Sequence, residues 1–335
     1  MQFNLKMRIS RCFLPLSALV VAASSLLSSC LGNSYRREEG MIWNTTYRIT
    51  YNGPAELADS ILPVLNDVGA SLNVFDKNSL VSRVNASDSA EIDSHFSRVY
   101  AESRIVNNAS EGMFDPTLSP LITAWGFGIG HEVTADTLAI DSILNFVGIG
   151  KTHLKGDWLV KDDPRIQFNF SAVAKGYGCD AVAAMFRRNG VNDYLVEIGG
   201  EIALGGMSPK GGAWRISIDK PIETDSTEIH DAVLVVEATD CGIATSGNYR
   251  NFRKEGGKTL GHTISPVTGR PVTTDVVSAT VVANTCMEAD AAATACMALG
   301  SKRAQAMLQT LKMEGMLILA DSTVWESQGF KNLVK

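Results

Sequence analysis

Residues 169–188 read NFSAVAKGYGCDAVAAMFRR, and this stretch shows the fold class most clearly. A strand pattern ends near Asn169, small residues follow, and apolar residues then recur at helical spacing as far as Arg188. Gly190 supplies a stop signal, because glycine readily adopts the left-handed conformation that ends many helices. The stretch therefore predicts a strand end followed by a helix over residues 172–188, with Lys175 in its first turn.

Helices and strands alternate around this stretch without a regular strand–helix–strand rhythm. Helical periodicity covers residues 55–70, 93–109, 135–147 and 289–311, and Gly300 lies inside the last of these. Strand patterns cover residues 43–51, 151–170, 193–203, 214–219, 232–238, 242–246, 259–265 and 276–282, with a closing hairpin at 316–320 and 323–325. This mixture favours an α+β fold with antiparallel sheet over a doubly wound parallel sheet.

The composition excludes several classes of protein. The chain has 335 residues, of which 45% are hydrophobic and 20% charged, so it is globular. The net charge is −6 and no run of Lys or Arg exceeds two, which argues against a nucleic-acid partner. The sequence contains no GxGxxG after a strand, no GxxxxGK[ST], no HExxH and no GxSxG. A standard dinucleotide, P-loop, zincin or hydrolase site is therefore not expected.

The first 29 residues have the pattern of a secretory signal. Lys6, Arg8 and Arg11 form a basic stretch, and residues 12–29 are apolar or small. Leu27-Ser28-Ser29-Cys30 looks like a bacterial lipobox, which predicts removal of residues 1–29 and lipidation of Cys30. The alternative is an ordinary secreted protein that is cleaved elsewhere. We expect a polar tether over 30–40, a folded domain over 41–335, and a protein held by its lipid on the exported, periplasmic side of the cell envelope.

The four cysteines after Cys30 are expected to be small core residues. Cys179, Cys241, Cys286 and Cys296 match no zinc spacing. An exported compartment permits disulfides without requiring them.

Two segments place polar residues where a strand or loop meets a helix. In residues 112–117 (GMFDPT), Asp115 is either a turn or helix cap, or it lies with Phe114 beside a flat ligand. Lys175 lies at a helix N-terminus, where a cation is unfavourable unless an anion is near. It therefore either contacts a bound anion or extends into solvent.

Two further segments carry a histidine and a carboxylate. His262 lies among Gly, Thr, Ser and Pro at a strand, where it is either structural or a base near neutral pH. Asp290 and Thr294 are four residues apart and share a helix face. Their oxygens suit Mg²⁺, although an Asp near a helix N-terminus also stabilises the helix dipole.

Taken together and in this order, the segments resemble the ApbE family of FAD:protein FMN transferases. The similar motifs are MIWNTTY (41–47), NSLVSRVN (78–85), FDPT (114–117), WGFG (125–128), AKGY (174–177), EIGGEI (197–202), ATSG (244–247), HTISP (262–266), TGRP (268–271) and ADA (289–291) with Thr294. The resemblance implies an α+β, T-fold-like architecture with a cleft for FAD.

The resemblance also implies an activity. Family members use Mg²⁺ to move the FMN half of FAD onto a Thr or Ser hydroxyl of a target protein through a phosphoester bond, and AMP leaves. The implied targets are flavin-accepting subunits of membrane redox complexes of the Nqr and Rnf types. Within the resemblance, a Mg²⁺-dependent FAD pyrophosphatase that gives FMN and AMP remains an alternative. A non-catalytic FAD-binding lipoprotein is the other.

Individual residues take roles from the same resemblance. It implies Mg²⁺ ligands at Asp290 and Thr294, with backbone carbonyls of Ala172 and Ala293, and it makes His262 the base. The implied FAD contacts are Met41, Phe75, Met113, Phe114, Asp115, Asn169, Lys175 and Ile264. This sequence departs from the family's usual residues at Asn169 and Ser265, where Asp is common, and at Phe75.

Overall fold

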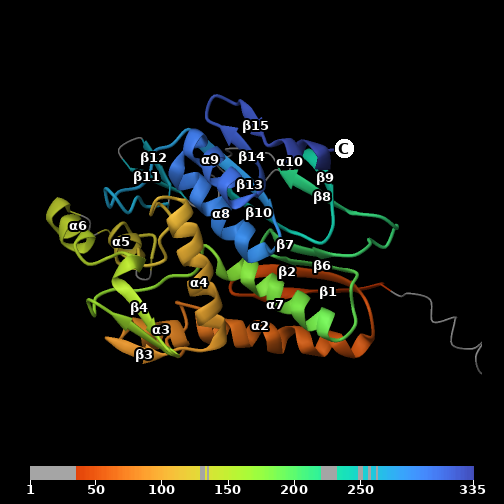
Figure 1. The fold of residues 1–335 in the computed structure, drawn as a ribbon, viewed down its shortest axis with the longest axis horizontal. Helices are drawn as coiled ribbons and strands as arrows, with labels where there is room; N and C mark the ends of the chain where they lie inside the picture. Colours follow the sequence, from red (N-terminus) through yellow and green to blue (C-terminus); the bar gives the residue numbers. More distant parts are fainter. Residues whose placement is uncertain are drawn as a thin grey trace, which may run out of the picture. The chain divides into compact units, whose positions relative to one another are not determined.

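The main sheet is antiparallel throughout and has the strand order β1-β2-β6-β7-β10-β13-β14-β15 (Figure 1). It is seen in a computed structural model that describes residues 35–128, 133, 136–219, 232–247, 252–255, 258–261 and 263–335. The strands are β1 (Tyr35–Ile42), β2 (Thr45–Asn52), β6 (Tyr194–Ile198), β7 (Glu201–Gly205), β10 (Gly242–Gly247), β13 (Val276–Ala283), β14 (Glu314–Leu319) and β15 (Val324–Glu326). The predicted α+β class with antiparallel sheet is confirmed.

Two helices pack side by side on one face of this sheet. α7 (Ala174–Arg188) contacts β6 and β7, and α8 (Cys286–Leu299) contacts β10 and β13. α2 (Ala58–Leu72), preceded by the short helix η2 (Ala55–Leu57), packs along α7. An apolar cluster lies between the main sheet and three further elements. It contains side chains of β8 (Trp214–Asp219), β9 (Ala232–Ala238) and α10 (Gln328–Leu333), together with Ile243 and Met316 of the sheet.

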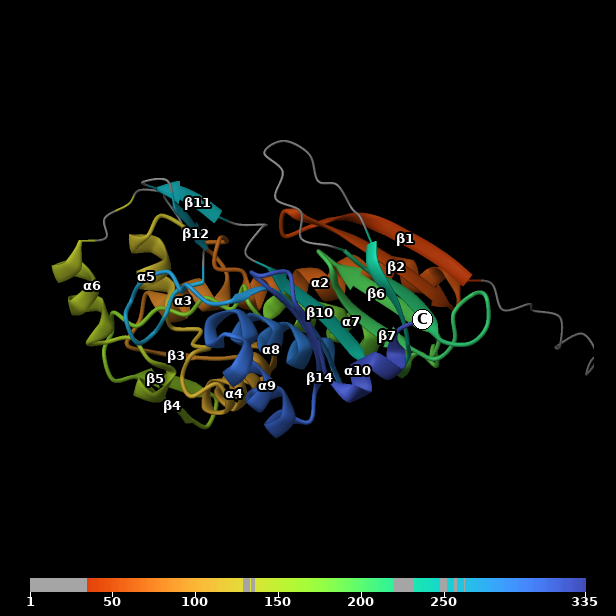
Figure 2. The ribbon, with the colours of Figure 1, turned by 90° about the horizontal axis from the view of Figure 1, so that it is seen from above.

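The remaining elements form a separate region beside α8. It contains α3 (Leu80–Asn85), α4 (Ser94–Ala109), α5 (Ser119–Ala124), α6 (Thr137–Leu144), η3 (Ile149–Lys151) and the three-stranded sheet of β3 (Ser89–Glu91), β5 (Trp158–Lys161) and β4 (Thr152–Lys155). In both views α5, α6 and this small sheet lie away from β1 and β2 (Figures 1 and 2). α9 (Ser301–Leu311) packs on α8 and β14, and β11 (Phe252–Glu255) pairs with β12 (Lys258–Gly261).

Several sequence-based boundaries differ from the structure. Of the strand pattern over residues 151–170, only β4 and β5 form, and they end at Lys161. The single helix expected over residues 289–311 is wrong, because Gly300 has φ +76° and separates α8 from α9. The strand expected over 193–203 is a hairpin that turns at Gly199 and Gly200, both with positive φ. Six residues of the expected tether, from Tyr35 to Gly40, belong to β1, where charged side chains suit a strand at the sheet edge.

The cysteines agree with the prediction of small core residues. Cys179, Cys286 and Cys296 are buried thiols, and Cys241 is a half-buried thiol. Among the helices that the structure describes, none is long and apolar enough to cross a lipid bilayer. Cys30 and the predicted signal lie outside the described residues.

Candidate functional site

Lys175 is the centre of a charged cluster at the start of α7. Its Nζ lies 3.0 Å from Oε1 of Glu201 on β7 and 3.8 Å from Oδ2 of Asp290 on α8. The backbone N–H of Gly176 donates a hydrogen bond of 3.0 Å to the same Asp290 oxygen. Glu201 and Asp290 are both buried, while Lys175 is only partly so. Two carboxylates and one ammonium therefore meet where the first turn of α7 crosses α8.

Two local features bring the helices this close together. A Cβ at Gly176 would lie 2.4 Å from the carbonyl oxygen of Cys286 and 2.8 Å from Cβ of Asp290, so only glycine fits there. The carboxylate of Asp180 accepts hydrogen bonds from the N–H groups of Cys286 (3.0 Å) and Met287 (2.8 Å). A residue of α7 thus caps the N-terminus of α8, whose free N–H groups need acceptors.

The cluster keeps Lys175 protonated. Burial alone would lower the pKa of Lys175, but the carboxylates of Asp290 and Glu201 outweigh burial and raise that pKa well above its usual range. Burial raises the pKa of Asp290, and the charge of Lys175 and the N–H of Gly176 oppose that rise. The start of α7 therefore carries a fixed positive charge beside two acidic groups.

The predicted Mg²⁺ ligands fit a magnesium ion by their chemistry. Asp290 and Thr294 lie one turn apart on α8, and Thr294 Oγ1 is 3.2 Å from Oγ of Ser246 on β10. Among described residues no hydrogen bond occupies Oδ1 of the buried Asp290, so that oxygen has lone pairs left for a ligand. Two carboxylates facing one ammonium also leave a negative charge for a cation to neutralise.

The predicted backbone ligands lie on the same two helices or next to them. Ala293 is in α8 between Asp290 and Thr294, and Ala172 lies two residues before α7. Within the described ranges, no three His, Cys, Asp or Glu side chains converge on one point. The donors described here are therefore one carboxylate, one hydroxyl and backbone carbonyls, which suits an ion that keeps waters or phosphates as further ligands.

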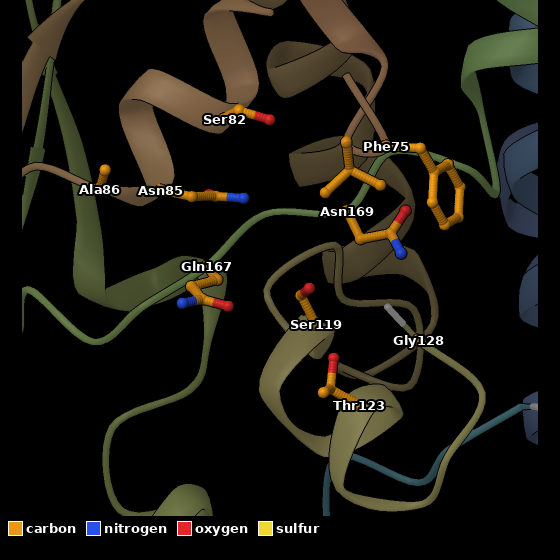
Figure 3. A pocket seen from close by; sticks show the side chains of 10 residues that line it. Phe75, Ser82, Asn85, Ala86, Ser119, Thr123, Gly128, Gln167 and Asn169 are labelled. Carbon is orange, nitrogen blue, oxygen red and sulfur yellow. The ribbon is translucent and has the colours of Figure 1, made fainter. Parts of the chain in front are cut away.

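A pocket of about 340 Å³ lies between α3, α5 and the extended chain after β5 (Figure 3). Among the residues that the structure describes, its wall carries apolar groups and uncharged polar groups, but no charged side chain. The lining residues are Val74, Phe75, Ser82, Asn85, Ala86, Ser119, Thr123, Gly128, Gln167 and Asn169. Such a lining suits a neutral, flat ligand with several hydrogen-bonding atoms.

Phe75 and Asn169 are the two predicted FAD contacts that line this pocket. Phe75 is 62% exposed, so its ring is open to stacking, and Figure 3 shows it beside Asn169. Asn169 Oδ1 accepts a hydrogen bond of 2.9 Å from the N–H of Ser171. In the described chain no hydrogen bond occupies its Nδ2. Residues 169–175 lead directly from this pocket to Lys175, so pocket and charged cluster share one segment.

The other predicted FAD contacts lie elsewhere. Met113, Phe114 and Ile264 are buried in the core, and Met41 on β1 is 65% exposed. None of the four lines the pocket. His262, the predicted base, lies outside the described residues.

The carboxylate of Asp115 holds two loops together. One oxygen accepts hydrogen bonds from the N–H (2.8 Å) and hydroxyl (2.6 Å) of Thr117, and the other accepts from the N–H of Ile149 (2.9 Å). Burial raises the pKa of Asp115, and these hydrogen bonds oppose the rise. Of the predicted alternatives, the contacts of Asp115 with Thr117 are those of a turn, and the N-cap of α5 is Leu118, not Asp115.

Several site residues were not singled out from the sequence. Glu201 stood in the EIGGEI motif without a role, and Asn85 ended the NSLVSRVN motif without one. Ser119, Thr123 and Gln167 have no local signal, because only the fold brings α5 next to the chain after β5. For Glu201, the signal was an acidic residue directly after a Gly-Gly turn.

Comparisons with known proteins show which sequences this chain resembles. The sequence profile of the ApbE family matches residues 43–317. The FAD:protein FMN transferase of Vibrio cholerae serotype O1 is 36% identical over 293 residues, which are 84% of this chain and 86% of that protein. The FAD:protein FMN transferase of Haemophilus influenzae is 31% identical over 318 residues, covering 88% and 90%.

Solved structures show the same fold. The flavin transferase ApbE from Vibrio cholerae superimposes with a TM-score of 0.79 at 32% sequence identity, and the match covers 90% of this chain and 99% of that one. The family profile spans most of the chain, and the two sequence relatives exceed 30% identity along most of their length. This chain belongs to the ApbE family.

Proposed function

We propose that this protein transfers FMN from FAD to a Thr or Ser hydroxyl of a target protein and releases AMP. Relatives that carry the name FAD:protein FMN transferase support the reaction. One structural observation carries the proposal for this chain: a neutral pocket is joined by residues 169–175 to a cluster that holds Lys175 beside Asp290. FAD has the matching parts, a neutral flavin ring and an anionic pyrophosphate.

The pocket and the charged cluster would bind different parts of FAD. The flavin ring would stack on Phe75 and take hydrogen bonds from amides such as that of Asn169. The pyrophosphate would lie at the start of α7, where Lys175 and the helix N-terminus both favour negative charge.

Bond making and breaking follow from this placement. The acceptor hydroxyl oxygen attacks the phosphorus of the FMN half, the bond from that phosphorus to the bridging oxygen breaks, and AMP leaves with that oxygen. Phosphoryl transfer depends mainly on positioning and charge neutralisation, so Lys175 would stabilise the charge that develops on the phosphates. The hydroxyl proton would go to His262, whose role remains a prediction from the sequence; a base there contributes about 10²–10⁴-fold.

Magnesium would be held by Asp290 and Thr294, with the carbonyls of Ala172 and Ala293 as further candidates. When bound, the ion would neutralise phosphate charge and orient the pyrophosphate.

We also propose that the protein is lipidated on Cys30 and anchored to the membrane on the exported side. The lipobox at residues 27–30 supports this. Flavin-accepting subunits of membrane redox complexes of the Nqr and Rnf types would then be reachable targets.

The deciding experiment uses residues 31–335, which include the compact unit from Tyr35 to Lys335. The protein is incubated with FAD, Mg²⁺ and an acceptor domain that carries a candidate Thr, and intact mass and AMP are measured. The expected result is a gain of one FMN on the acceptor, lost with EDTA and in Asp290→Ala. Free FMN and AMP without acceptor labelling would favour the FAD pyrophosphatase. Bound FAD with neither product would favour a binding protein.

A further inference from the structure

Lys161 is a buried cation that the proposed reaction does not use. It ends β5 and is only 6% exposed. Its Nζ lies within hydrogen-bonding distance of four backbone carbonyl oxygens. These belong to Val84 (3.1 Å), Asn85 (3.4 Å), Pro164 (3.0 Å) and Ile166 (3.0 Å). In the part of the chain that the structure describes, no carboxylate lies within ion-pair distance of this ammonium.

Burying an ammonium with no carboxylate beside it costs free energy, and hydrogen bonds must offset that cost. Burial lowers the pKa of Lys161, and the attraction of Asp88 and Asp163 opposes this decrease. Keeping the positive charge at this buried position therefore costs free energy. A buried charge needs strong hydrogen bonds, and carbonyl dipoles supply them. Two of the four carbonyls are at the C-terminal end of α3, where the helix dipole favours a cation, and that of Val84 also accepts a hydrogen bond of 3.2 Å from the N–H of Ser87.

The carbonyls belong to two chain segments, and both segments form walls of the pocket. Ser82 and Asn85 on α3 form one wall, and Gln167 and Asn169 follow the turn at 164–166. Figure 3 shows Asn85 near the extended chain that carries Gln167 and Asn169.

A second clamp joins the same two segments. The Asn85 side chain accepts a hydrogen bond from the N–H of Phe168 (2.7 Å) and donates one to its carbonyl (2.9 Å). Asn85 thus pairs with Phe168 as a neighbouring strand would, and its own backbone carbonyl is one of the four around Lys161. Lys161 and the Asn85 side chain therefore both tie the end of α3 to residues 164–168, the segment that leads into the other wall of the pocket.

We propose that Lys161 is a positioning residue for the nucleotide pocket: its ammonium ties the end of α3 to residues 164–166 and so sets the spacing of Asn85 and Asn169 around the bound flavin. This inference rests on the proposed function, because it takes FAD as the occupant of the pocket. Lys161 touches no reacting atom, so its loss should change the binding of FAD and leave the chemical step alone.

The first test is a split between KM and kcat in Lys161→Met, which keeps the length of the side chain and removes the charge. The KM for FAD in the transfer assay is expected to rise about tenfold, because FAD binding would then have to restore the spacing of the two pocket walls at a cost of about 1.4 kcal/mol. At saturating FAD, kcat is expected to stay within about twofold of the wild type.

The second test is chemical rescue. Lys161→Ala leaves a space lined by four carbonyl oxygens, and propylammonium chloride supplies the missing amine. We expect propylammonium to restore the KM for FAD, whereas sodium chloride at equal ionic strength should not. If Lys161→Met does not fold, Lys161→Ala purified with propylammonium and then dialysed gives the same comparison.

A matched control separates positioning from general stability. Phe330→Leu weakens the apolar cluster of β8, β9 and α10, which shares no residue with the pocket lining, and should lower the melting temperature without raising the KM. Hydrogen exchange at the amides of Phe168 and Asn169 gives a readout that needs no FAD, and it should accelerate in Lys161→Met alone.

Two outcomes would overturn the inference. One is an unchanged KM together with unchanged exchange at residues 168–169 in a folded Lys161→Met protein. The other is an equal rise of KM in Phe330→Leu, which would make the effect one of stability. Failure of the proposed function is seen separately, because the wild type itself would then leave the acceptor unlabelled, whether or not it binds FAD.

Discussion

The carboxylate of Asp290 accepts a hydrogen bond of 3.0 Å from the backbone N–H of Gly176. This contact helps to join the helix that carries both predicted side-chain ligands of Mg²⁺ to the helix that carries Lys175. It requires the backbones of α7 and α8 to approach closely, and the missing side chain at Gly176 permits that approach. The proposed sites for the cation and for the pyrophosphate therefore lie on the same helix pair.

Gly176→Ala should separate these helices. The new Cβ would lie 2.4 Å from the carbonyl oxygen of Cys286, which is backbone and has little freedom to move. We expect a loss of about 1–3 kcal/mol in the free energy of unfolding, measured by urea denaturation. Transfer activity should also fall, because Asp290 loses its partner.

Gly150→Ala is the matched control, since no atom lies within 4 Å of a Cβ built at Gly150. Equal stability of the two variants would show that the close approach at Gly176 is not needed.

Glu201→Gln should change which carboxylate pairs with the Lys175 ammonium. With its 3.0 Å partner neutral, the ammonium would be attracted mainly to Asp290, which is 3.8 Å away. Lys175 would then compete with Mg²⁺ for that carboxylate. We expect the Mg²⁺ concentration for half-maximal activity to rise about tenfold, in line with a change of about 1.4 kcal/mol.

Glu237→Gln serves as the control for Glu201→Gln. It removes a surface carboxylate 3.8 Å from Arg215, and an exposed pair of this kind contributes little. A Mg²⁺ requirement that moves equally in both variants would mean that overall charge, rather than Lys175, is responsible.

The sequence predicted those parts of the fold that depend on local patterns. The helix from Ala174 to Arg188 and the helix after its cap at Asp93 were found close to their observed bounds. The break at Gly300 was missed because the apolar spacing continues across it, and only the positive φ divides the helix. β1 was missed because a charged edge strand resembles a polar linker.

Site residues that lie in sequence motifs could be predicted, whereas residues that only the tertiary fold brings together could not. Lys175, Asp290 and Thr294 stood out by residue type and position, and the structure brings Lys175 and Asp290 together. Lys161 gave no signal, because one lysine at a strand end is normally exposed. Its burial arises from carbonyls of residues 84–85 and 164–166, whose approach depends on the tertiary fold.

Thr294→Val tests the hydroxyl on α8. Valine has nearly the shape of threonine, so the change removes an oxygen that lies 3.2 Å from Ser246 and leaves the packing of α8 largely intact. If that oxygen is a Mg²⁺ ligand, the activity at limiting Mg²⁺ should fall about tenfold or more. Thr294→Ser keeps the hydroxyl and should retain near wild-type Mg²⁺ dependence. Equal Mg²⁺ curves for the valine and serine variants would remove Thr294 from the metal site.

Glu102 on α4 should make stability depend on pH. Burial, with further repulsion from Glu288 and Asp180, raises the pKa of Glu102 from 4.5 to about 7. Between these two pH values the folded state holds a proton that the unfolded state releases. The contribution of Glu102 to stability is therefore full below pH 4.5, falls as pH rises through this window, and is unfavourable and constant above pH 7.

Glu102→Gln isolates that contribution, because glutamine keeps the shape of the protonated acid at every pH. Urea unfolding at pH 4.5 and pH 8 should show the variant equal to the wild type at the lower pH. At pH 8 it should be more stable by on the order of 1 kcal/mol, allowing for solvent screening. All other titrating groups are common to both proteins and cancel in the difference. A difference in stability that is the same at both pH values would mean that Glu102 does not titrate in this window, and that its burial is relieved by contacts that both side chains make.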